Sequence, residues 1–132
     1  IMSIIRQESA FQAGIISSAG ACGLMQILPS TGRFISQSID KDDFQRQYLF
    51  DPDRNIALGI WYFNYLQKKF DENLILALAG YNAGPAKVKK WLKNYSMNDP
   101  EEFIENIPYD ETRDYVKNIL RNQSFYQKVY GK

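Results

Sequence analysis

Glu8 is the residue whose type and position most suggest chemistry. Ile1, Ile5 and Glu8 are spaced i, i+4 and i+7, so they share one face of a helix. At the edge of a core, desolvation disfavours a charged carboxylate and raises its pKa. A carboxyl group with a raised pKa can act as a general acid near neutral pH. The alternative is a partly exposed glutamate that pairs with Arg6, and position alone leaves both readings open.

The chain contains no histidine, and this absence narrows the chemistry. It excludes Ser-His-Asp and Cys-His catalysis, His-ligated zinc and histidine general bases. The single cysteine, Cys22, cannot form an internal disulfide. It lies between Ala21 and Gly23, and we expect a small buried residue, because a nucleophilic thiol needs an activating partner. The main rivals of Glu8 for proton transfer are therefore missing.

The segment 79–85, Ala-Gly-Tyr-Asn-Ala-Gly-Pro, lies between two predicted helices. Its glycines and small residues allow a backbone to approach a ligand closely. Tyr81 offers a flat face to a sugar ring, and Asn82 offers both a donor and an acceptor. The alternative is a glycine-rich turn with a packed tyrosine.

Two other groups of residues have types and spacings that could form a site. Glu111 and Tyr115 are spaced i, i+4 and share a helix face, where they form either a local hydrogen bond or part of a polar cleft. The acidic stretch that begins at Asp40 invites a calcium-loop reading. That loop needs Gly at its sixth position and Glu at its twelfth, which are Gln45 and Asp51 here, so the reading fails.

The elements that must position these residues read as almost entirely helical. Helix start signals stand at Asp51-Pro52, Asn73 and Asp99-Pro100. No alternating strand pattern or internal repeat is present, and no apolar run approaches the roughly 20 residues of a membrane span. The prediction is an all-α, compact bundle of six to eight short helices with little or no sheet. The predicted helices are residues 1–11, 29–38, 52–66, 74–79, a helix opened by Pro85, one opened by Pro100, and 111–126.

Length and composition favour one soluble domain. The 132 residues, 45% of them apolar, are enough for a single core, so residues 1–132 are expected to form one domain. The net charge of +1 shows no global bias toward nucleic acid or an anionic membrane. The chain opens on Ile1 within a helical pattern and without a preceding N-cap, so we expect a fragment of a longer protein.

Taken together, the motifs resemble the lytic transglycosylase domain of the soluble type, a goose-lysozyme-like fold that cleaves bacterial peptidoglycan. Each motif is weak alone, but their order along nearly the whole chain is specific. The matching segments are Glu8-Ser9, Ser17 with Gly20-Ala21-Cys22-Gly23-Leu24-Met25-Gln26, Asn55-Ile56 with Gly59, Tyr81-Asn82-Ala83-Gly84, and Ile107-Pro108-Tyr109-Asp110-Glu111-Thr112-Arg113 with Tyr115-Val116.

The resemblance implies roles for individual residues. Glu8 would be the catalytic acid and then the base in a reaction that leaves a 1,6-anhydro-N-acetylmuramic acid end. It also implies no cofactor and no metal. The substrate-binding residues would be Ser17, Met25, Gln26, Leu28, Tyr81, Asn82, Glu111 and Tyr115.

The resemblance also implies peptidoglycan glycan strands as the partner, a monomer, no nucleic-acid partner, and a location in the periplasm or cell envelope. Three alternatives remain at this point. A lysozyme-like muramidase would hydrolyse the same bond with water. A peptidoglycan-binding module would lack catalysis, although a desolvated Glu8 argues against it. A helical nucleic-acid binder would rest on Lys87, Lys89, Lys90 and Lys93.

Overall fold

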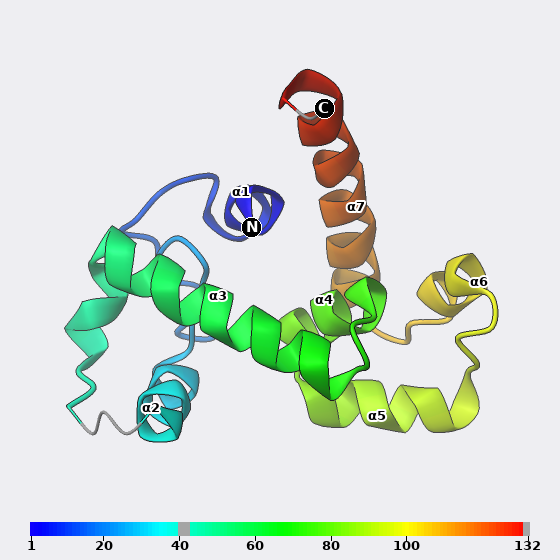
Figure 1. Cartoon of the computed structure of the whole chain (residues 1–132), viewed down its shortest axis with the longest axis horizontal. Helices are drawn as coiled ribbons and strands as arrows, with labels where there is room; N and C mark the ends of the chain where they lie inside the picture. Colours follow the sequence, from blue (N-terminus) through cyan, green and yellow to red (C-terminus); the bar gives the residue numbers. More distant parts are fainter. Residues whose placement is uncertain (40–42, 131–132) are drawn as a thin grey trace. The chain divides into compact units, whose positions relative to one another are not determined.

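The computed structural model describes residues 1–39 and 43–130, apart from the side chains of residues 125, 126, 129 and 130. These residues form seven α-helices and one 3₁₀ helix, and the part of the chain so described contains isolated β-bridges but no sheet (Figure 1). The predicted all-α class is therefore confirmed. The chain divides into two compact units, Ile1–Tyr62 and Phe63–Lys132. Two aspartates of the acidic stretch for which the calcium-loop reading fails, Asp40 and Asp42, lie outside the described residues.

The first unit begins with helix α1, Met2–Ser9, whose inner face buries Ile4 and Ile5. The helix ends at Ala10, which adopts the left-handed conformation with φ 50° and donates its N–H to the carbonyl of Arg6 at 3.0 Å. This end comes two residues before the predicted one. A left-handed residue stops a helix because the next N–H can no longer reach the carbonyl four residues back.

Helix α2, Pro29–Ser38, and the 3₁₀ helix η1, Arg46–Phe50, contact each other in the first unit. Pro29 occupies the first helical position, where its missing N–H costs nothing. Gly32 is buried against the ring of Phe44, and a Cβ atom there would lie 2.6 Å from two ring carbons. The glycine therefore allows the ring to lie directly on the α2 backbone.

Helix α3, Pro52–Lys69, runs from the first unit into the second. Asp51 caps it, since its Oδ1 accepts the N–H of Asp53 at 3.0 Å. In the second unit, Asn73 caps helix α4 by accepting the N–H of Leu76 at 3.1 Å, and Asp99 caps helix α6 by accepting the N–H of Glu101 at 3.1 Å. The three predicted helix starts are confirmed.

Helix α4, Leu74–Ala83, does not break at Gly80 as the sequence predicted. It continues through Tyr81 and Asn82 and ends at Gly84, where φ is 91°. Gly80 is buried, and a Cβ atom there would lie 3.2 Å from the ring of Phe70. The prediction was wrong because a glycine inside a helix costs only about 1 kcal/mol, which close packing can outweigh.

Three further helices complete the second unit: α5 at Pro85–Asn94, α6 at Pro100–Glu105 and α7 at Asp110–Tyr130. Helix α4 contacts α5 and α7, and α6 contacts α7 (Figure 1). At 21 residues, α7 extends beyond its predicted end. Among the described residues, no helix combines the length and apolarity that crossing a bilayer requires. The buried apolar side chains of these helices include Leu78, Val88, Phe103, Val116 and Ile119.

Candidate active site

Glu8 lies in the last turn of α1 and is half-buried. Its neighbour Ser9 is buried and donates its hydroxyl to the carbonyl of Ile5 at 3.1 Å. Left-handed Ala10 and Phe11, with φ 50° and 65°, turn the chain away at once. Glu8 therefore lies where the buried face of α1 meets solvent, but Ile1 of its predicted apolar stripe is 44% exposed.

Ser17 closes a tight turn in the loop that follows α1. Its N–H donates to the carbonyl of Ala21 at 2.9 Å, and its Oγ accepts the N–H of Ala21 at 3.1 Å. The N–H of Gly20 donates to the carbonyl of Ser17 at 2.9 Å. Because Oγ is used here as an acceptor, the hydroxyl proton of the half-buried Ser17 remains able to donate to a ligand.

Gln26 braces the same loop from within. Its Nε2 donates to the carbonyls of Ile15 and Gly23, at 3.1 and 3.0 Å. Its backbone takes a positive φ of 49°, an uncommon conformation for a residue other than glycine. On either side of it, Cys22 and Ile27 exchange two backbone hydrogen bonds of 3.0 Å. With Nε2 occupied, the side-chain oxygen of Gln26 is the atom that can accept from a ligand.

Asn55 is the buried residue that ties this loop to α3, and the sequence assigned it no role. Its side chain is fully buried, and Oδ1 accepts the N–H of Met25 at 2.7 Å. Its Nδ2 donates to the carbonyls of Cys22 and Leu49, at 2.9 and 2.8 Å. A Cβ atom at Gly23 would collide with this amide and with the carbonyl of Leu49. A polar residue on the inner face of an apolar helix was the signal that could have revealed it.

Met25 and Leu28, two predicted substrate-binding residues, lie in different environments. Met25 is 0% exposed and packs on Gly59, where a Cβ atom would lie 2.7 Å from the methionine Cε and closer still to Sδ. Leu28 is 39% exposed. Met25 therefore shapes the loop from below, whereas Leu28 is available at the surface. Cys22 is buried, as predicted.

Tyr81 and Asn82 belong to the second unit and lie in the last turn of α4, both half-buried. The Tyr81 ring packs edge to face on Phe63, with centroids 6.4 Å apart and an interplanar angle of 64°. The Oδ1 of Asn82 accepts the hydroxyl of Thr112 at 2.7 Å. Thr112 is buried, so it holds the Asn82 amide in one orientation and leaves its Nδ2 protons for a ligand.

Glu111 and Tyr115 lie on α7 but differ in exposure. Glu111 is exposed in the first turn, whereas Tyr115, one turn later, is 4% exposed. Between them, Arg113 donates its Nη1 to the carbonyl of Ile107 at 3.1 Å and forms an ion pair with Asp110. This guanidinium joins the segment before α7 to its first turn and so supports the position of Glu111.

Neighbouring lysines lower the pKa values of two charged groups in the second unit, Glu105 and Lys89. The ammonium of Lys117 lies 2.5 Å from Glu105 Oε1 and lowers the pKa of that carboxyl group. Lys69 lies close to Lys89 and lowers its pKa through a side-chain hydrogen bond and like-charge repulsion. In the part of the chain that the structure describes, no group of three His, Cys, Asp or Glu side chains could hold a metal ion.

Two protein-family models match successive parts of the chain. A family model of the transglycosylase SLT domain matches residues 1–104. A second family model, of the soluble lytic transglycosylase helical domain, matches residues 106–132. The expectation of one domain over residues 1–132 stays a prediction.

Several relatives match nearly the whole chain. The soluble lytic murein transglycosylases of Salmonella typhimurium and Escherichia coli K12 are 41% and 40% identical to it and match 98% of its length. The chain spans about one fifth of these relatives, 20% of each. A membrane-bound lytic murein transglycosylase C from Histophilus somni is 27% identical.

Solved structures agree with these sequence matches. The 70-kDa soluble lytic transglycosylase of Escherichia coli matches 99% of this chain and 22% of its own, with a TM-score of 0.93 and 40% identity. An inactive glutamate-to-glutamine mutant of the lytic transglycosylase Slt from Pseudomonas aeruginosa matches 98% of this chain and 21% of its own, with a TM-score of 0.89 and 41% identity. A third structure, with a TM-score of 0.94 and 39% identity, holds a 70-kDa soluble lytic transglycosylase in complex with bulgecin A. The chain belongs to the transglycosylase SLT domain family, as its motifs predicted.

Proposed function

We propose that this chain is the catalytic domain of a peptidoglycan lytic transglycosylase. It cleaves the β-1,4 bond between N-acetylmuramic acid and N-acetylglucosamine without water and leaves a 1,6-anhydro end. Membership of the transglycosylase SLT domain family supports this reaction, as do relatives named soluble lytic murein transglycosylases at about 40% identity. We place the protein in the periplasm or cell envelope because murein is its proposed substrate.

Glu8 is the proposed acid and base, and its position is the observation that carries the proposal. It is half-buried at the end of a helix that buries Ile4 and Ile5, in a chain that has no histidine to move protons. A glutamate-to-glutamine mutant of the Pseudomonas aeruginosa relative is inactive, which supports a role for a glutamate in the reaction.

The proposed mechanism uses the substrate to replace a second carboxylate. Most glycosidases place two carboxyl groups across the scissile bond, one of them as nucleophile or base. Here the N-acetyl oxygen of N-acetylmuramic acid forms a bond to its own anomeric carbon. The glycosidic carbon–oxygen bond breaks at the same time, and the leaving oxygen takes the proton of Glu8.

The second step returns the proton to Glu8. The Glu8 carboxylate removes the proton of the sugar's 6-hydroxyl, and that oxygen forms a bond to the anomeric carbon. The bonding pair of the departing N-acetyl oxygen returns to the acetamido group. One carboxyl group thus serves as acid and then as base, and no water enters the product.

The remaining residues of the proposed site bind the glycan strand. Ser17 contributes its hydroxyl proton, Gln26 its side-chain oxygen and Asn82 its amide protons. Tyr81 offers an aromatic face, with Leu28 as an apolar wall and Met25 beneath it. Glu111 and Tyr115 complete the set of proposed substrate-binding residues. The directed polar atoms of Ser17, Gln26 and Asn82 support these assignments.

Replacement of Glu8 by glutamine tests the proposal. Glu8→Gln keeps the shape of the side chain but removes its acidic proton, so the release of soluble fragments from purified peptidoglycan should fall by at least about 100-fold. Glu101→Gln changes an exposed carboxyl group on α6 and should keep parent activity. If Glu8→Gln releases fragments at a rate near that of the parent, Glu8 is not the acid and base of the reaction. Binding of peptidoglycan by the parent without any release would make the chain a binding module.

A further inference from the structure

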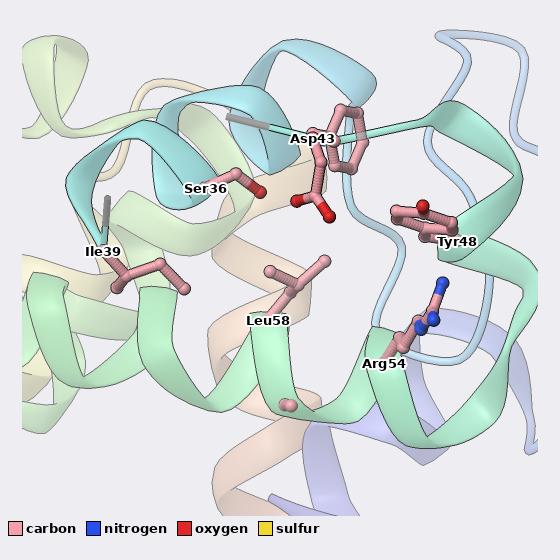
Figure 2. Close-up of a pocket in the computed structure, with 8 residues that line it drawn as sticks. Ser36, Ile39, Asp43, Tyr48, Arg54 and Leu58 are labelled. Carbon is pink, nitrogen blue, oxygen red and sulfur yellow. The ribbon is translucent and has the colours of Figure 1, made fainter. Parts of the chain in front are cut away.

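The first unit contains a pocket. None of the residues assigned to peptidoglycan cleavage lines it. It has a volume of about 250 Å³ and opens between α2, η1 and the first half of α3 (Figure 2). Four of its lining residues, Ile39, Phe44, Ala57 and Leu58, present apolar atoms. A pocket of this size is smaller than the roughly 300–1,000 Å³ of sites for drug-sized ligands, so its occupant must be a small molecule.

The walls of the pocket are held in place by packing beneath them. The ring of Phe44 rests on Gly32 of α2 and meets the ring of Tyr48 edge to face, with centroids 6.5 Å apart. Leu49 is buried and its carbonyl accepts from Asn55, which anchors η1 to α3. The pocket is therefore formed before any ligand arrives, which lowers the entropic cost of binding.

Ser36 presents a hydroxyl group to this pocket. The residue is only 8% exposed, and its hydroxyl makes no hydrogen bond with any residue that the structure describes. By contrast, Ser38 on the same helix bonds the carbonyl of Phe34 at 2.8 Å. The hydroxyl group is accessible within the pocket, so water or a ligand can supply its hydrogen bond. In Figure 2 the Ser36 hydroxyl points toward Asp43.

Two opposite charges also line the pocket. The Asp43 carboxylate points into it in Figure 2, and within the described residues it forms no ion pair. Arg54 stacks on the ring of Tyr48, 4.0 Å from its centroid, and its Nε lies 3.8 Å from Asp51. That contact uses Nε, so the two terminal nitrogens of Arg54 remain available to an anionic group. The face of Tyr48 that the guanidinium covers is not available for stacking on a sugar.

We propose that this pocket binds a free aliphatic α-amino acid as its zwitterion. The ammonium group of the ligand pairs with Asp43 and donates a hydrogen bond to the hydroxyl oxygen of Ser36. Its carboxylate pairs with the guanidinium of Arg54, and its aliphatic side chain lies on Leu58 and Ile39. An α-amino acid is the smallest common molecule that carries both charges and an apolar group. This site is independent of the Glu8 chemistry.

A titration followed by nuclear magnetic resonance tests the proposal with leucine as the probe. Adding leucine to the ¹⁵N-labelled chain should give saturable shifts of amide signals in α2, η1 and the first half of α3. N-acetylleucine lacks the ammonium charge and leucinamide lacks the carboxylate, so each should bind at least about tenfold more weakly than leucine. Comparing L-leucine with D-leucine separates an amino acid derived from proteins from one of cell-wall type.

Variants test whether leucine binds through the proposed side chains. Asp43→Asn and Arg54→Gln should each weaken leucine binding by about tenfold, since each removes one charge-assisted contact. Ser36→Ala should weaken it by a smaller factor. Asp53→Asn on α3 and Arg33→Gln on α2 change exposed charges outside the pocket and should bind like the parent. Glu8→Gln should also bind like the parent, so this test and the activity test can fail separately.

Three results would overturn the proposal. The first is the absence of saturable shifts up to the solubility limit of leucine. The second is a set of shifts that maps outside the pocket or survives both charge variants. The third is binding of N-acetylleucine and leucinamide as tight as that of leucine, which would show that the charges of the pocket play no part.

Discussion

At the scale of single residues, the proposed site depends on polar side chains that hold other groups in place. Asn55 makes three hydrogen bonds to the backbone of the loop and of η1, and Thr112 orients the amide of Asn82. Sequence reasoning found Glu8, Gln26 and Asn82 as candidates but not these supports. Two of the three partners of Asn55, Met25 and Cys22, lie 30 and 33 residues away, and the partner of Thr112 lies 30 residues away. No local pattern encodes such a distance.

Replacement of Asn55 should show how much the loop depends on it. Asn55→Ala removes three hydrogen bonds and leaves the N–H of Met25 and the carbonyl of Leu49 without this partner, whereas the carbonyl of Cys22 keeps its bond from Ile27. We expect the free energy of unfolding to fall by about 3 kcal/mol, since each buried group left unpaired costs roughly 1–3 kcal/mol. Urea denaturation measures this, with the exposed Asn64→Ala on α3 as the control. A loss no larger than that of the control would contradict the account.

The ion pair between Glu105 and Lys117 gives a second test at this scale. Lys117 lowers the pKa of Glu105, so the pair favours the folded state above the ordinary glutamate pKa of 4.5, and this contribution disappears as the pH falls through the lowered value. Lys117→Met should raise the pKa of Glu105 toward its ordinary value. A side-chain titration by nuclear magnetic resonance measures the shift. Lys128→Met on the same helix should leave it unchanged, and an unchanged pKa in Lys117→Met would show that the pair is not formed.

At the scale of the elements, start signals were predicted well and glycines poorly. Asp51, Asn73 and Asp99 cap their helices because capping depends only on the next few residues. The sequence predicts that the helix ends before Gly80, although α4 continues through it. A glycine that ends a helix and a glycine that admits a neighbouring ring look the same in a sequence. Only the packing of Phe70 against α4 distinguishes them.

Gly59 provides a test of packing between α3 and the loop. Alanine usually stabilises a helix relative to glycine by about 1 kcal/mol. Here the added methyl group would collide with Met25, so Gly59→Ala should instead destabilise the fold by about 1–3 kcal/mol.

A double-mutant cycle with Met25→Ala separates this collision from other effects. If the methyl group and the methionine compete for the same space, the double variant should lose less stability than the sum of the two single variants. Thermal unfolding of the four proteins measures the difference. Strict additivity would show that the methionine is not the residue with which the methyl group collides.

At the scale of the whole molecule, the motifs predicted the family although most of the fold's contacts could not be foreseen. The chain corresponds to about one fifth of relatives that are named soluble lytic murein transglycosylases. Each short motif meets a local structural requirement, such as the positive φ of Gly23 at 80°, so the motifs and their order can be recognised in the sequence. The division into two compact units has no such local signature, since it arises from contacts between residues far apart in the chain.

The identity of the reaction product tests the central claim most directly. Purified peptidoglycan digested by the parent chain, and separately by Glu8→Gln, can be analysed by liquid chromatography and mass spectrometry. The account predicts muropeptides with a 1,6-anhydro end from the parent, each lighter by one water molecule than the hydrolysed form, and almost none from the variant. Products with a hydrolysed reducing end would contradict the proposed lyase reaction and make the chain a lysozyme-like muramidase.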